Sequence, residues 1–199
     1  QPTFLCSIFL RDKKVTRMED LKGLKLRVFG GVQSQLVTAL SATGVTVPSG
    51  DVYMALDRGT LDGTITGIDN FLDRKFFEVA KYGLKLPELP LASGVFALLM
   101  NKETWNGLPP DLQRTIEQIS QDISSAELKK LIDEEQSVWD TLGKKIEVYT
   151  ISPEEEKRWR DAVMAAGIAD KYVQETAAKG YPAKEALELM RKVVSEYKK

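Results

Sequence analysis

Histidine is missing from the 199-residue sequence, and cysteine occurs only once. Without histidine the chain lacks the commonest general base, the Ser-His-Asp arrangement and the most frequent transition-metal ligand. A single thiol forms neither an internal disulfide nor a cysteine cluster for zinc, so we expect Cys6 to be a small buried apolar residue. These absences argue against a triad hydrolase and against a zinc site.

A long apolar run and an excess of positive charge are also missing. The first apolar stretch, "TFLCSIFL", is too short to cross a bilayer and lacks the charged flank of a signal peptide, so it predicts a strand. The 28 basic and 29 acidic side chains nearly cancel, which leaves no general basic field for nucleic acid. Hydrophobic residues make up 43% of the chain, enough for a globular protein with a real core.

What the sequence does contain is an alternation of strand and helix patterns, which predicts an α/β fold with a parallel sheet. After the first strand the predicted elements are a strand over 24–29, a helix over 34–42, a strand over 45–47, a helix over 51–58, a strand over 61–67 and a helix over 70–82.

The second half begins with an irregular, proline-containing connection and the apolar run "VFALLM", which predicts a buried strand over Val95–Met100. One long amphipathic helix then runs to Gly143, and we expect it to span more than one lobe rather than to kink near Ser124. The sequence "KIEVYTI" predicts a strand, Ser152 caps the next helix, and the last helix begins near Ala183.

The stretch "EDLKGLKLRVFGG" places Arg27 at the carboxyl end of a predicted strand, directly before two glycines. Ligands bind at that edge of open parallel sheets, and a guanidinium there offers a rigid fork to a carboxylate or a phosphate. The pattern alone also allows an exposed strand-end arginine. Gly30 and Gly31 lack the third glycine of a dinucleotide loop and the ending of a P-loop, so no nucleotide site is expected.

Four motifs in order, "EDLKGLKLRVFGG", "GDVYMALDRGTLDG", "RKFFEVAKYG" and "LLMNKETWNGLPPDLQ", give the chain a family resemblance. The chain resembles the extracytoplasmic solute-binding subunits of tripartite ATP-independent periplasmic (TRAP) transporters, the DctP-like family. This implies a two-lobed α/β architecture of the periplasmic-binding-protein kind, with parallel-rich sheets, a long lobe-spanning helix and only part of the first lobe, its N-terminal part being absent. Residues 1–92 would form mainly the second, ligand-binding lobe, 93–145 the connection to the first lobe, and 146–199 a strand and helices packed across the lobes.

The resemblance also implies a function. A periplasmic binding protein of this family closes on a small organic acid and delivers it to the permease subunits in the membrane, without catalysing a reaction. Arg27 matches the family arginine that forms a bidentate salt bridge with the ligand carboxylate. We expect a monomer that binds no nucleic acid and needs no cofactor.

Further lining residues follow from the same motifs less directly. Thr66 and Ser49 match positions that touch the ligand in sialic-acid binders, where an asparagine and an aromatic residue stand, and Ser7 matches the place of a second arginine in some members. These departures argue against a sugar-acid ligand and against metal-assisted binding. Phe29 and Gly30 are candidates because they stand beside Arg27 in the chain. Thr64 is a candidate because it stands where many members present an acidic, amide or aromatic group to the ligand or a metal.

Two further classes of function stay open from the residues alone. An enzyme acting on a small carboxylate would turn its acid over, although the missing histidine and nucleophile motif argue against it. A ligand-sensing domain would be joined to a signalling partner. A transport receptor would instead bind its acid stoichiometrically and release it unchanged.

Overall fold

The fold is given by a computed structural model that describes residues 6–87 and 98–197. The elements in chain order, with η for a 3-10 helix, are β1 (Cys6–Leu10), η1 (Met18–Leu21), β2 (Lys25–Val28), α1 (Gly31–Ala39), β3 (Thr43–Thr46), α2 (Val52–Asp57), β4 (Gly63–Gly67), α3 (Ile68–Asp73), η2 (Phe76–Glu78), β5 (Tyr82–Leu84), α4 (Lys102–Asn106), α5 (Pro110–Gly143), β6 (Glu147–Tyr149), α6 (Pro153–Ala165), α7 (Ile168–Ala177) and α8 (Ala183–Tyr197).

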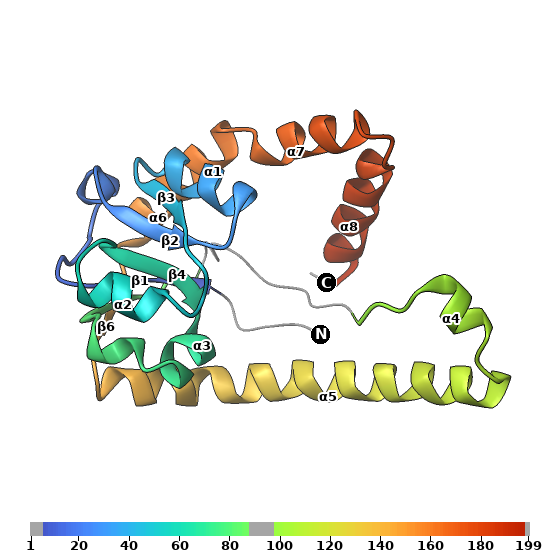
Figure 1. The fold of residues 1–199 in the computed structure, drawn as a ribbon. Coiled ribbons are helices and arrows are strands. Elements are labelled where there is room, and N and C mark those ends of the chain that lie inside the picture. Colours follow the sequence, from blue (N-terminus) through green and yellow to red (C-terminus); the bar gives the residue numbers. More distant parts are fainter. Residues whose placement is uncertain (1–5, 88–97, 198–199) are drawn as a thin grey trace.

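The centre of the molecule is a six-stranded mixed sheet in the order β3-β2-β4-β1-β5-β6 (Figure 1). β2 runs parallel to β3 and β4, and β5 runs parallel to β6. β1 is antiparallel to both of its neighbours, β4 and β5. The predicted α/β class is therefore confirmed, and the sheet is mixed but parallel-rich, because three of its five strand pairings are parallel and only the two that involve β1 are antiparallel.

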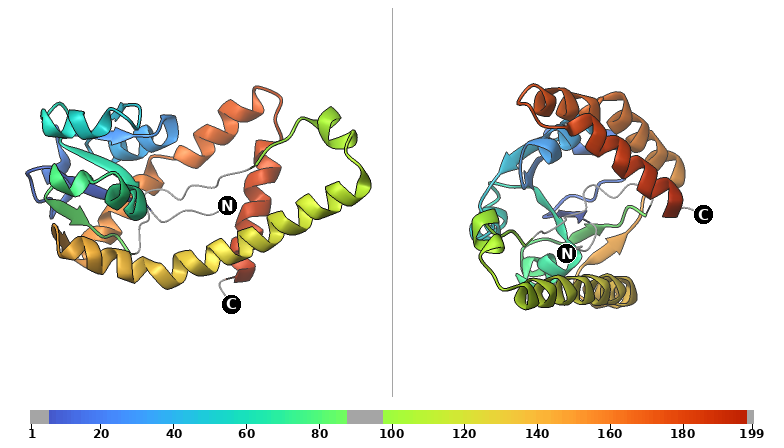
Figure 2. Two further views of the ribbon diagram at one scale, coloured as in Figure 1. Left: turned by 60° about the horizontal axis from the view of Figure 1, so that its bottom comes forward. Right: turned by 90° about the vertical axis from the view of Figure 1, so that its right-hand side faces the viewer.

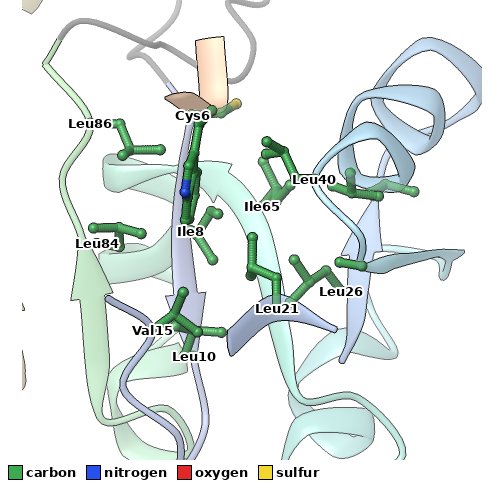
Figure 3. Packing of buried hydrophobic residues seen from close by; sticks show 14 of the residues in the cluster. Cys6, Ile8, Leu10, Val15, Leu21, Leu26, Leu40, Ile65, Leu84 and Leu86 are labelled. Atoms are coloured by element: carbon green, nitrogen blue, oxygen red, sulfur yellow. The ribbon is translucent and has the colours of Figure 1, made fainter. Parts of the chain in front are cut away.

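The two faces of the sheet carry separate apolar clusters, because successive side chains of a strand point to opposite faces. On one face Ile8, Leu26 and Ile65 pack beneath α1 and α6, and Figure 3 shows this cluster. On the other face Phe9 stacks on Phe71 of α3, with ring centroids 3.7 Å apart, beneath α2, α3 and the end of α5. Cys6 is buried, as its sequence context predicts.

The helix α5 is a single element of 34 residues without an interruption, as predicted. Trp139 and Leu142 in its last turns are buried against the sheet, while its first half extends well beyond the strands (Figure 1). Figure 2 shows that α7 and α8 leave the sheet on the opposite side and that α8 then turns back toward α5. The division of the chain near residues 92 and 145 stays a prediction.

Two predicted elements are wrong. The helix expected over 70–82 ends at Asp73, because Lys75 takes a left-handed conformation (φ 54°), and the chain continues as η2 and then as strand β5. Of the strand expected over Val95–Met100, residues 95–97 lie outside the described residues. Leu98–Met100 form no strand, and Leu98 is 90% exposed.

Candidate ligand-binding site

Arg27 is held at the carboxyl end of β2 by neutral groups. Its Nε donates a hydrogen bond to the carbonyl oxygen of Val47 (3.1 Å), and its Nη2 donates to Oγ of Ser49 (3.0 Å). The guanidinium carbon also lies 4.0 Å from the centroid of the Phe29 ring. These contacts fix the plane of the guanidinium, and among the described residues they leave three of its five N–H groups for another acceptor.

The charge of Arg27 has no partner of opposite sign nearby. The residue is 4% exposed, and within residues 6–87 and 98–197 no carboxylate oxygen lies within 4.0 Å of its nitrogens. Burial, followed by the positive charge of Arg74, lowers the pKa of Arg27 below its usual range. A buried cation is favourable only when an anion or several acceptors compensate its lost hydration, and among the described residues only the two neutral acceptors, Val47 and Ser49, do so.

The strand register places three further polar side chains on the same face as Arg27. Arg27 pairs with Thr64 across β2 and β4, and Thr66 lies two residues further along β4. Ser7 pairs with Thr66 across β1 and β4. Because paired residues share a face of a sheet, these four side chains lie on one face over three adjacent strands.

The two threonines of β4 differ in their hydrogen bonds, although both are fully buried. Oγ1 of Thr66 accepts a hydrogen bond from Nδ2 of Asn70 (2.8 Å). Oγ1 of Thr64 has no hydrogen-bond partner among the residues that the structure describes. Most buried polar side chains are hydrogen-bonded, so the Thr64 hydroxyl is an available group beside Arg27.

Gly30 and Phe29 form the turn from β2 into α1. Phe29 is 52% exposed, and its backbone N–H donates to Oε1 of Gln33 (2.7 Å), whose side chain is buried. Nε2 of Gln33 has no hydrogen-bond partner in the structure. A side chain added at Gly30 would meet no atom within 4 Å, so this turn is open on the side of a missing Cβ.

Structure therefore brings the predicted site residues to one end of the sheet, around Arg27. Arg27, Ser49 and Phe29 are in direct contact, Thr64, Thr66 and Ser7 share its face, and Gly30 follows Phe29 in the chain. Sequence reasoning missed Gln33 and Asn70. Asn70 had a detectable signal, since it stands four residues before Arg74, the spacing of side chains that meet on a helix.

Two other family positions have structural roles here. The hydroxyl of Tyr53 donates to Oε2 of Glu78 (2.9 Å), which joins α2 to η2. Oδ2 of Asp62 accepts from the backbone N–H of Lys25 (2.8 Å) at the start of β2. Across the ranges that the structure describes, no group of three or more His, Cys, Asp or Glu side chains is placed to hold a metal ion.

Comparison with known proteins places this geometry in a family. Residues 7–179 match the family model of bacterial extracellular solute-binding proteins, family 7. The chain belongs to this family, which confirms the resemblance to the TRAP solute-binding subunits. A curated relative, a solute-binding protein of Sulfitobacter sp. (strain NAS-14.1), is 33% identical over 111 residues, which cover 54% of this chain and 32% of the relative.

Solved structures share the fold. A TRAP periplasmic solute-binding protein from Bordetella bronchiseptica with bound (R)- and (S)-mandelate is 20% identical with a TM-score of 0.82, covering 98% of this chain and 62% of the other. A TRAP solute-binding protein from Rhodoferax ferrireducens in complex with copurified benzoate is 23% identical with a TM-score of 0.81, covering 100% and 62%. The chain thus spans about a third to a half of these curated relatives and about six-tenths of these solved chains.

Within the described residues, no helix combines the length and the apolar character that a bilayer crossing requires. Even α5, with its 34 residues, carries charged side chains throughout.

Proposed function

We propose that this chain is the ligand-binding part of a TRAP transporter receptor, which captures a small organic acid and delivers it to the membrane permease. The observation that carries the proposal is the buried guanidinium of Arg27, which within residues 6–87 and 98–197 contacts only neutral groups and retains free donors. A carboxylate accepts two parallel hydrogen bonds from such a fork. Thr64 would supply a further hydroxyl to the ligand.

The family consists of extracellular solute-binding proteins. Relatives of this fold were crystallised with mandelate and benzoate, each of which carries a carboxylate. On this proposal the protein works in the periplasm as a monomer and releases its acid unchanged. The helix α5 would join the lobes that close on the ligand, and closure would follow from the better contacts that the ligand makes in the closed state.

The test is calorimetry of the full-length protein with a panel of monocarboxylates and dicarboxylates. The substitution Arg27→Ala is expected to weaken binding of the best acid by about two to four powers of ten, because removing one partner of a buried ion pair costs about 3–5 kcal/mol. Arg114→Ala is the matched control, since Arg114 is an exposed arginine near the start of α5. Unaltered affinity in Arg27→Ala would refute the proposed role.

A further inference from the structure

A chain of hydrogen bonds leads out of the candidate site to a second arginine. Nδ2 of Asn70 donates to Oγ1 of Thr66 (2.8 Å), and Oδ1 of Asn70 accepts from Nε of Arg74 (2.6 Å). Both ends of the Asn70 amide are therefore engaged, which fixes its orientation. Because Thr66 is fully buried in the site, this chain fixes the guanidinium of Arg74 relative to the residues around Arg27.

The position of Arg74 places two cations close together. Its positive charge is near enough to contribute to the lowered pKa of Arg27. No carboxylate oxygen of the described residues lies within 4.0 Å of the Arg74 nitrogens. The carboxylate of Asp69, on the same helix, lies close enough to Cys6 to help raise the pKa of its thiol. Like charges repel, and an anion that contacts both guanidinium groups would relieve this repulsion.

The donors of Arg74 also fit this role. Only its Nε is used within the described residues, and the side chain is exposed at the end of α3. The terminal nitrogens of a guanidinium present a planar pair of donors that matches a carboxylate. Thr66 adds its own hydrogen, since its oxygen already accepts from Asn70.

We propose that Arg74 is a specificity-determining residue of the site, which binds a second anionic group of a ligand whose first carboxylate is held by Arg27. Asn70 is the positioning residue that connects Arg74 to Thr66. This inference rests on the proposed function and adds the substrate class. The ligand is an acid with two anionic groups, and it binds more tightly than a monoacid of the same length.

The experiment compares matched acids on the full-length protein by calorimetry. The pairs are succinate with butyrate, glutarate with valerate, and phthalate with benzoate. The protein is expected to bind the dicarboxylate of at least one pair about tenfold or more tightly, as a hydrogen bond to a charged group contributes about 1.5–3 kcal/mol. In Arg74→Gln the ratio of dicarboxylate affinity to monocarboxylate affinity should fall to about one, while the monocarboxylate affinity stays within about twofold of the wild-type value.

Two more variants separate specificity from folding. Asn70→Ala should lower the same ratio, because Arg74 loses its support, although its own charge is retained. Arg114→Gln removes an exposed arginine from α5 and should leave the ratio unchanged. The inference is overturned if no pair shows a preference, or if Arg74→Gln weakens both members of a pair equally.

Failure of this inference can be distinguished from failure of the proposed function. If Arg27→Ala abolishes binding of both acids while Arg74→Gln leaves the dicarboxylate-to-monocarboxylate affinity ratio unchanged, only the role of Arg74 is wrong. If Arg27→Ala leaves both affinities intact, the carboxylate site itself is wrong, whatever Arg74 does.

Discussion

Thr64 and Thr66 stand two residues apart on the same strand and are equally buried. Their hydroxyl groups nevertheless contribute differently to the stability of the unliganded protein. The hydroxyl of Thr66 accepts a hydrogen bond from Asn70, whereas that of Thr64 is equally buried and has no partner among the described residues. An unpaired buried polar group costs about 1–3 kcal/mol. The unliganded protein carries this cost at the point where a ligand acceptor would relieve it.

The substitution Thr64→Val should therefore stabilise the unliganded protein and weaken ligand binding. We expect the free energy of unfolding to rise by about 1 kcal/mol, because the unpaired hydroxyl is replaced by a methyl group of similar size. Affinity for the best acid should fall about tenfold, as one hydrogen bond to the ligand is lost. Urea unfolding without ligand and calorimetry with ligand measure the two effects.

Thr66→Val is the control for this pair of measurements. It breaks the bond to Asn70 and leaves an amide donor unpaired, so the free energy of unfolding should fall by about 1–2 kcal/mol. A Thr64→Val protein that is less stable than the wild type would contradict the argument.

Residues of the site were predictable from sequence to different degrees. Arg27 stands out because a strand end before two glycines has a recognisable pattern, and family motifs indicate Thr66. Gln33 lacks such a signal, because the position of its amide depends on the angle between β2 and α1. The hydrogen bond from the backbone N–H of Phe29 to Oε1 of Gln33 is a consequence of that angle. A local pattern does not contain that angle.

At the scale of elements, Tyr149 joins the edge strand β6 to the loop after β1. Its hydroxyl donates to the carbonyl oxygen of Val15 (2.9 Å) and accepts from the backbone N–H of the same residue (3.0 Å). Lys14 lies over the ring, with Nζ 4.8 Å from its centroid. Burial raises the pKa of Tyr149 to about 12 from a reference value of 10.0.

This raised pKa predicts an alkaline loss of stability. In the unfolded chain the phenol ionises near pH 10, whereas in the folded protein it stays neutral until about pH 12, so its contribution is complete below pH 10 and lost between these values. Tyr149→Phe should lower the free energy of unfolding at pH 7 by about 1–3 kcal/mol, because two buried backbone groups lose their partner.

The same variant should be less sensitive to alkali than the wild type. Burial also raises the pKa of Cys6 to about 11, but that thiol is present in both proteins and cancels from their difference. Urea unfolding at pH 7, 9.5 and 11.5 measures the effect. If the free energies of unfolding of the two proteins fell equally between pH 7 and pH 11.5, the loss of stability in alkali would not come from Tyr149.

Most elements were predictable because apolar periodicity and caps are local signals. Ser152 caps α6 as expected, with its Oγ accepting from the backbone N–H of Glu155 (3.2 Å). The direction of β1 was not predictable, because it depends on which strands become neighbours. The left-handed conformation of Lys75 was not predictable either. It ends the helical stretch before β5, although the helical spacing of apolar residues continues in the sequence.

At the scale of the whole molecule, only the last turns of α5 pack on the sheet in the described structure, whereas its first turns contact the α4 segment, where Nε2 of Gln113 donates to the carbonyl oxygens of Trp105 and Leu108. Trp139 is 4% exposed, whereas Ile119 and Ile123 are about half exposed on the part that extends beyond the sheet (Figure 2). Since helical stability in proteins comes mainly from packing an apolar face, the two ends should differ in local stability.

Hydrogen exchange followed by mass spectrometry tests this difference in the 199-residue chain. Amides of residues 114–124 should exchange at least about tenfold faster than those of residues 136–143, because opening free energies follow local packing. Helix α6, which buries Trp159 completely, is the protected reference. Uniform protection along α5 would contradict the prediction.

The strand order has a kinetic consequence for the candidate site. Ser7, Arg27 and Thr64 come from three strands that are adjacent in the sheet but separated by many residues in the chain. Such contacts between distant segments form only after slow loop closure. A ligand therefore finds no binding surface on the chain before these strands have paired, so it should not accelerate folding. Its stabilising effect should instead appear as a slower rate of unfolding.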